Sequence, residues 1–267
     1  AVALACGNIG DNNSTRAILQ SLQNDPHQFV RIAVAKACGN IGDNNSTRDI
    51  LQSLQNDTSL FVREAVALAC GNIGDNNSTR AILQSLQNDT EYDVRIAVAV
   101  AFGNIGDNDL ARTILQSLQN DTNSHVRKAV AVACGNIGDK AWTRDILHSL
   151  KNDISPLVQV AVADACGNIG DNNWTRDILE SLQNDTNLYV KACVAKACGN
   201  IGENGWTRDI LQSLKEDKDD GVRIAVAAAC GKIGDNDWTR DILQRLQNDT
   251  NSHVRIAVAK ACGNIGE

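Results

Sequence analysis

The apolar and polar residues of this chain alternate in a pattern that returns at a fixed spacing. The segment Gly39-Asn40-Ile41-Gly42, or a variant that differs at one residue, begins again at eight other glycines. These glycines are Gly7, Gly71, Gly103, Gly135, Gly167, Gly199, Gly231 and Gly263. The spacing is 32 residues throughout, without insertion or deletion. A period of this length predicts an array of stacked units, each of them one small structural motif.

Each repeat predicts two short helices. In the copy at residues 57–88, apolar residues at helical spacing predict a first helix, helix A, that is capped by Ser59 and ends at Ile73. A second helix, helix B, is expected to begin at a cap provided by Asp75 or Asn76. Helices of about three turns are marginal in water by themselves, so each pair must bury its apolar faces against neighbouring pairs. The pattern therefore predicts an α-solenoid.

Two glycines of each repeat have predicted structural roles, and the apolar residues that barely change between copies are predicted to form the core. Gly74 follows helix A and is expected to end it in a left-handed conformation. Gly71 lies inside helix A in all nine copies, although glycine costs about 1 kcal/mol against alanine there, so we expect a close helix crossing. The positions that barely change between copies are expected to be buried: Val34, Ala35, Ala37, Gly39, Ile41, Ile50, Leu51 and Leu54.

The string Val-Arg-x-Ala-Val-Ala-x-Ala-Cys-Gly-Asn-Ile-Gly-Asp at residues 62–75 resembles the HEAT-like repeats named after phycobilisome bilin lyases. It is also similar to the artificial HEAT-like repeat binders built from that type. The resemblance covers the whole chain and implies an all-α fold: a right-handed α-solenoid of about eight two-helix repeats, forming a single domain over residues 1–267. Two departures from the family pattern are Cys70 and its equivalents in place of leucine, and tryptophan where a small residue is common.

Helix A varies chiefly at three places, which lie three and then four residues apart and therefore share one face of the helix. Such mixed side chains, with exposed apolar residues among them, are typical of a contact surface. In the artificial binders that the chain resembles, the matching positions line the concave binding face. The alternative is drift on a solvated face without function. The predicted partner-binding residues are Phe29, Ile32, Lys36, Phe61, Glu64, Leu68, Asp93, Ile96, Val100, His125, Lys128, Leu157, Val160, Asp164, Tyr189 and Lys196.

These positions favour a non-catalytic scaffold that binds a protein or peptide partner. Every carboxylate that recurs does so in nearly all repeats, whereas a catalytic constellation is normally unique, so we do not expect an enzyme. We also expect no metal site and no cofactor, because no histidine or cysteine pair has the spacing of metal ligands. Two alternatives stay open. Repeat sequence at both ends favours a subunit that associates end to end into a filament, and the family resemblance implies a chromophore-handling role like that of a bilin lyase.

Three further rows follow the same period. Trp142, Trp174, Trp206 and Trp238 occupy a place near the start of helix B that holds serine in the first repeats, so the blocks 1–108 and 109–267 differ there. The tryptophans are expected to pack between neighbouring helices B, with a stacking platform for a ligand as the alternative. An arginine row on helix B, which includes Arg80, and an aspartate row, which includes Asp57, are expected to form a ladder of inter-repeat ion pairs and caps.

Eight of the nine cysteines occupy one repeat position, which Phe102 fills in the remaining copy. A position that accepts either phenylalanine or cysteine is apolar, so we expect buried, reduced thiols and a cytoplasmic, reducing location. Cys193 follows no pattern.

Composition narrows the partner class. The hydrophobic content is 43% but aromatic residues make up only 3%, and methionine is absent, so small aliphatic side chains must supply the core. A net charge of −7 disfavours nucleic acid as a partner, because phosphate binding needs an excess of Lys and Arg. No apolar run is long enough to cross a membrane, and no signal peptide is recognisable. The chain does not begin with methionine, so a fragment or processed product is expected.

Overall fold

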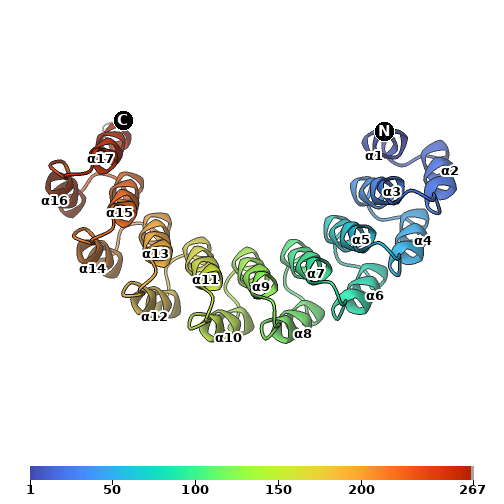
Figure 1. Ribbon diagram of the computed structural model, residues 1–267, viewed down its shortest axis with the longest axis horizontal. Helices are drawn as coiled ribbons and strands as arrows, with labels where there is room; N and C mark the ends of the chain where they lie inside the picture. Colours follow the sequence, from blue (N-terminus) through green and yellow to red (C-terminus); the bar gives the residue numbers. More distant parts are fainter. Residues whose placement is uncertain (266–267) are drawn as a thin grey trace. The chain divides into compact units, whose positions relative to one another are not determined.

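The computed structural model describes residues 1–265, and in this range it contains 17 helices and no strand (Figure 1). The helices A are α1 (Val2–Ile9), α3 (Gln28–Ile41), α5 (Leu60–Ile73), α7 (Tyr92–Ile105), α9 (Ser124–Ile137), α11 (Pro156–Ile169), α13 (Leu188–Ile201), α15 (Asp220–Ile233) and α17 (Ser252–Ile265). The helices B are α2 (Asn13–Leu22), α4 (Asn45–Leu54), α6 (Asn77–Leu86), α8 (Asp109–Leu118), α10 (Ala141–Leu150), α12 (Asn173–Leu182), α14 (Gly205–Leu214) and α16 (Asp237–Leu246). The predicted all-α solenoid is confirmed.

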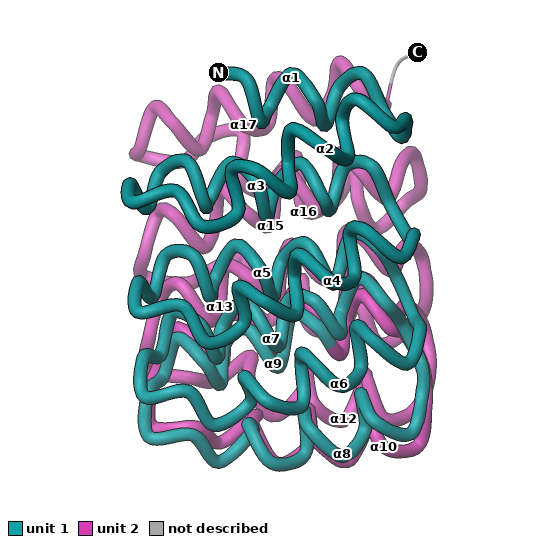
Figure 2. The backbone as a smooth tube through the Cα atoms, turned by 90° about the vertical axis from the view of Figure 1, so that its right-hand side faces the viewer, with its two compact units in different colours: residues 1–133 teal, residues 134–267 magenta. Residues whose placement is uncertain are grey.

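The chain forms two compact units, residues 1–133 and 134–267, whose boundary lies inside α9 (Figure 2). Within the first unit α1, α3, α5 and α7 pack in succession as one layer, and α2, α4 and α6 form a second layer beside them. Within the second unit α11, α13, α15 and α17 pack in succession in the same way. The helices A thus make the main contacts between repeats. That residues 1–267 act as a single domain stays a prediction.

The glycine inside helix A lies at the closest approach of two helices A. A Cβ atom built on Gly71 would lie 2.7 Å from Cα and 3.0 Å from Cβ of Ala101, which belongs to the next helix A. In other repeats of each unit, a Cβ atom built on the equivalent glycine would lie 2.7 to 2.9 Å from Cα of the equivalent alanine, as at Gly39 with Ala69 and at Gly199 with Ala229. The prediction that a close crossing requires this glycine is confirmed. The packing of alanine against glycine sets how near the helices A can come.

The turn from helix A to helix B is fixed by polar side chains. Asn76 caps α6 through its side chain, which accepts from the Thr79 amide at 2.9 Å. Thr79 is buried, and its hydroxyl donates to the Gly74 carbonyl at 2.8 Å. Of the two predicted caps Asn76 is therefore correct, whereas Asp75 forms an ion pair with Arg80. Sequence reasoning did not single out the threonine, although it is the buried polar centre of this turn.

Two details of the predicted helix ends need correction. Gly74 has φ 92° and ψ −167°, so its φ is positive as expected, but the residue is not in the left-handed helical region. This combination is open essentially to glycine alone, which explains why the glycine is present. Ser59 occupies the N-cap position of α5 without accepting a hydrogen bond from the first turn; its hydroxyl donates to the Gln28 side chain of the preceding repeat at 2.5 Å.

The core is built from the constant positions. Val34, Ile50 and Leu54 are buried, and so are the equivalent residues in the inner repeats, but Ile41 is only half-buried, because it lies on the last turn of its helix. Phe102 is fully buried in the cysteine row, as expected. Seven of the eight row cysteines are buried and unpaired, and burial raises the pKa of the Cys70 thiol to about 12. The eighth is an exception to the prediction: Cys262 on α17 is exposed.

Candidate functional site

The face of helix A that carries the variable positions is open to solvent. None of the sixteen predicted partner-binding residues is buried. The side chains of Phe29, Phe61, Leu157 and Tyr189 are 65%, 51%, 46% and 68% exposed. Large apolar side chains that stay this exposed contribute nothing to the core, so this face is available for contact with another molecule.

In the first unit the structure brings six of the predicted residues together. They line a hollow of about 280 Å³ between α3 and α5, with Ala65 as its remaining wall: Phe29, Ile32, Lys36, Phe61, Glu64 and Leu68. Burial raises the pKa of the Glu64 carboxyl, the nearby Asp93 raises it further, and Lys36 acts in the opposite direction. The hollow is therefore mainly apolar, with one acid and one base at its edge. Asp93, Ile96, Val100, His125 and Lys128 lie on α7 and α9, outside this hollow.

In the second unit a larger hollow of about 530 Å³ lies between the variable faces of α13 and α15. Of the predicted residues, Val160, Tyr189 and Lys196 line it, whereas Leu157 and Asp164 do not. Asp164 is close by, since its carboxylate accepts from the Lys196 ammonium at 2.8 Å. This bond draws a lysine of one repeat toward an acid of the repeat before it.

Sequence reasoning missed several residues of the larger hollow. They are Cys193, Gly199, Asn200, Ala225, Ala229 and Lys232, whereas Ala192 and Ala228 lie at two of the three variable places of helix A. Cys193 and Lys232 could have been found by comparing the copies with one another. The equivalent of Cys193 is alanine in every other copy, and the equivalent of Lys232 is asparagine in every other copy. A search for positions that vary in many copies overlooks positions that change in only one.

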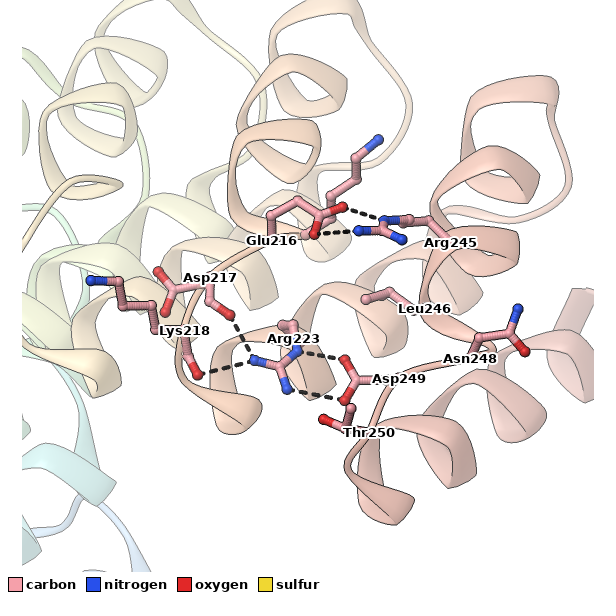
Figure 3. Close-up of a pocket in the computed structure, with 10 residues that line it drawn as sticks. Glu216, Asp217, Lys218, Arg223, Arg245, Leu246, Asn248, Asp249 and Thr250 are labelled. Atoms are coloured by element: carbon pink, nitrogen blue, oxygen red, sulfur yellow. Dashed lines mark hydrogen bonds and ion pairs between the residues drawn. The ribbon is translucent and has the colours of Figure 1, made fainter.

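A third hollow, of about 430 Å³, lies at the turns that connect helix B to the next helix A, and charged residues line it (Figure 3). Most of its charges are already paired. Arg223 donates to the Asp249 carboxylate at 2.6 and 3.0 Å and to the Asp217 carbonyl at 2.7 Å, and Arg245 pairs with Glu216. Because these groups satisfy one another, the hollow is a structural junction between repeats.

The same junction recurs along the chain and corrects the predicted ion-pair ladder. Arg63 on α5 binds the Asp89 carboxylate of the next junction at 2.6 and 2.9 Å, and the Asp57 carbonyl of its own junction at 2.8 Å. The cations that bind the aspartate row thus lie on helix A, and the aspartate row was predicted correctly. The arginine row on helix B was assigned wrongly, because Arg80 pairs within its own repeat with Asp75 at 2.6 Å.

Burial and pairing act against each other at these aspartates. Burial alone would raise the pKa of the Asp57 carboxyl, but hydrogen bonds from Arg31 and from the Ser59 amide outweigh it, so the pKa is lowered. The Asp57 carboxylate is therefore ionised at neutral pH and holds its junction together.

The tryptophan row also connects repeats. All four tryptophans are half-buried. The Trp174 indole N–H donates to the Asp139 carboxylate at 3.1 Å, and that of Trp206 donates to Asp171 at 3.0 Å. In each case the acceptor belongs to the preceding repeat. These contacts favour packing between repeats over a ligand platform.

Two other features that could indicate a function are a metal centre and a membrane-spanning helix. Among residues 1–265, no group of three His, Cys, Asp or Glu side chains is arranged to hold a metal ion. Within that same range, no helix has the length and the hydropathy that a membrane crossing requires.

Paired helices stacked at a constant interval define the class of helical repeat proteins, in which such arrays serve as scaffolds. A model of HEAT repeats matches residues 15–91, 79–153, 143–229 and 207–267. The chain belongs to the HEAT repeat family. No curated protein gave a match.

Three solved structures are similar to this chain. The YibA protein of Escherichia coli is 18% identical, with 99% of this chain and 95% of that chain covered and a TM-score of 0.62. An engineered protein is 21% identical over 95% of this chain and 79% of that chain, with a TM-score of 0.49. Human deoxyhypusine hydroxylase in complex with glycerol is 17% identical over 95% and 96%, with a TM-score of 0.43. At these identities the similarity concerns the fold alone.

Proposed function

We propose that this chain is a non-catalytic scaffold that binds a protein partner on the variable face of its helices A. The observation that carries the proposal is the contrast between the two faces of helix A. On one face Gly71 and Ala101 are in tight contact and hardly vary, while on the other Phe61 and Tyr189 stay more than half exposed. Exposed aromatic residues are enriched among the residues that dominate protein interfaces.

The chemistry of the face also supports binding over catalysis. The polar groups that line the two hollows are three lysines, one glutamate, one tyrosine, one asparagine and one cysteine, and Asp93 and Asp164 lie close by. Neither hollow combines a nucleophile with a base that would activate it, which is the arrangement that covalent catalysis needs. The unpaired thiols and their burial further support a reducing compartment such as the cytoplasm.

Affinity capture followed by mass spectrometry tests the proposal. The full chain would be immobilised as wild type, as Phe61→Glu, as Tyr189→Glu and as the matched control Gln52→Glu, whose exposed position lies on helix B. We expect a partner to be retained by the wild type and by the control, and to be lost from one or both aromatic variants. The circular dichroism spectrum should be the same for all four proteins. A partner that all four retain equally would refute the assignment of the face.

A further inference from the structure

The hollow between α13 and α15 is where the repeats depart most from their common sequence. Five positions at or beside it are unusual, and the departures act in the same direction. Ala192 and Ala228 occupy variable places where other repeats carry larger side chains (Ile, Val, Leu, Lys, Asp or Glu), and beside the hollow Gly221 occupies the place that holds Phe29 or Tyr189 elsewhere. The two alanines line the hollow, and their small side chains leave its space of about 530 Å³ open.

The remaining two departures change the chemistry of the hollow. Cys193 replaces an alanine on its wall and adds a polarisable, weakly polar surface, since burial raises the pKa of its thiol to about 11 and the thiol stays protonated at neutral pH. Lys232 replaces the asparagine of the other copies and brings a positive charge to the rim. The hollow is therefore apolar inside and cationic at its edge.

The two lysines at the rim differ in how far their charge is compensated. The Lys196 ammonium donates to the Asp164 carboxylate at 2.8 Å, so it is paired with an acid. The Lys232 ammonium donates to the Asn200 amide oxygen at 2.6 Å, which satisfies one hydrogen bond but leaves the charge uncompensated. No carboxylate lines the hollow. On a chain with a net charge of −7, this cationic rim complements an acidic partner.

A second hollow, of about 470 Å³, adjoins the first between α15 and α17. The two share Ala228, and the second adds the apolar side chains of Ile224 and Ile256 and a further rim lysine, Lys260. Neighbouring helices pack roughly 8–10 Å apart. An extended chain covers that distance in about three residues.

We propose that these two hollows together receive an acidic segment of a partner polypeptide, which inserts bulky apolar side chains about three residues apart and places Asp or Glu beside them, facing Lys232 and Lys260. This proposal rests on the proposed function and specifies the partner. An open hollow favours a polypeptide over a small molecule. The Tyr189 side chain at its rim is 68% exposed, whereas sites for small molecules bury most of the surface of their ligand.

A displayed library of random dodecapeptides, panned on the full wild-type chain, tests the proposal. We expect the enriched peptides to carry apolar residues three positions apart with adjacent acids. Three of them, synthesised with a fluorophore, then serve as probes for binding by fluorescence anisotropy. The substitution Ala228→Phe should fill the hollow and weaken their binding at least tenfold. The control Gln52→Phe, which adds the same side chain at an exposed position of helix B, should leave binding unchanged.

Two further measurements locate the probes. The substitution Lys232→Asn, which restores the residue of the other repeats, should weaken the acidic probes about threefold and should reduce the salt dependence of their binding. In a Cys262→Ala background, a saturating probe should slow the reaction of the Cys193 thiol with a small disulfide reagent, because Cys193 lines the hollow.

The outcomes separate the two proposals. The assignment of these hollows to an acidic segment is overturned if basic peptides are enriched, or if Ala228→Phe and Lys232→Asn bind the selected probes as the wild type does. Binding elsewhere on the helix A face would still support the proposed function. If only a small-molecule carboxylate, and no peptide, protects Cys193, the polypeptide assignment is overturned. If no peptide is enriched at all, the assignment to a linear acidic segment is overturned, while the affinity capture described above still decides the proposed function.

Discussion

A methyl group added at the helix A crossing should separate two repeats. In Gly71→Ala the new Cβ would lie 2.7 Å from Cα of Ala101, which is backbone and cannot rotate away, so α5 and α7 would have to move apart. Alanine gains about 1 kcal/mol over glycine in a helix interior. Overpacking of a tight contact costs roughly 1–3 kcal/mol. The second effect should win, because the clash is with backbone, and we expect a net loss of up to about 2 kcal/mol in the free energy of unfolding.

The chain contains a matched control for this substitution. Gly263 occupies the same place on α17, and no atom lies within 4 Å of the Cβ that alanine would add. Gly263→Ala should therefore leave the stability unchanged or raise it by up to about 1 kcal/mol. Urea unfolding, followed by circular dichroism at the helical band, measures both variants against the wild type. If Gly71→Ala were as stable as Gly263→Ala, the explanation of the glycine by helix contact would be refuted.

The charged rows give two more predictions. Arg63→Ala should lower the free energy of unfolding by roughly 1–3 kcal/mol, because it leaves the buried Asp89 carboxylate without its partner. Arg80→Ala should lower it by less than about 0.5 kcal/mol, because Arg80 and Asp75 are both exposed to solvent. Urea unfolding of the two variants side by side measures the difference, and equal losses would contradict the ladder. The second prediction concerns pH. The pKa values of the Asp57, Asp89 and Asp121 carboxyls are lowered in the folded chain, so the stability that these groups contribute is present above about pH 4, the unfolded value, and is lost as pH falls through the folded pKa. Urea midpoints should therefore be constant from pH 7 to pH 5 and fall below about pH 4; a midpoint that rises on acidification would refute the prediction.

The period of the sequence was enough to predict both helices of every repeat, the buried positions and the reason for Gly71. These features depend on spacing within one repeat and on which residue types tolerate burial. The ion-pair ladder was predicted only in part, because Arg63 reaches Asp89 in the next repeat. That pairing depends on how one repeat is inclined to the next, and several residue pairs are compatible with the same spacing. Arg80 had an equally plausible sequence position but finds Asp75 nearer.

The sequence predicted which face of helix A carries the candidate site, but it did not predict the hollows on that face. The positions equivalent to Phe29, Ile32 and Lys36 follow from helical geometry, since residues three and four apart share a face. The hollow between α13 and α15 arises because Ala192 and Ala228, which come from different repeats, adjoin each other. An alanine among large residues reads as an unremarkable position in a list, and only the neighbouring repeat reveals the space that it leaves.

The uniform junctions between repeats have a consequence for how such a chain can change. Most junctions between repeats share the same two contacts. A glycine packs against an alanine of the next repeat, as Gly39 does against Ala69, and a helix A cation pairs with an aspartate of the next repeat, as Arg31 does with Asp57. Recombination within the gene that deletes, doubles or reorders whole 32-residue units would therefore join compatible surfaces. The order of side chains along the exposed face could then be rewritten in single steps, while the contacts that hold neighbouring units together would be inherited intact.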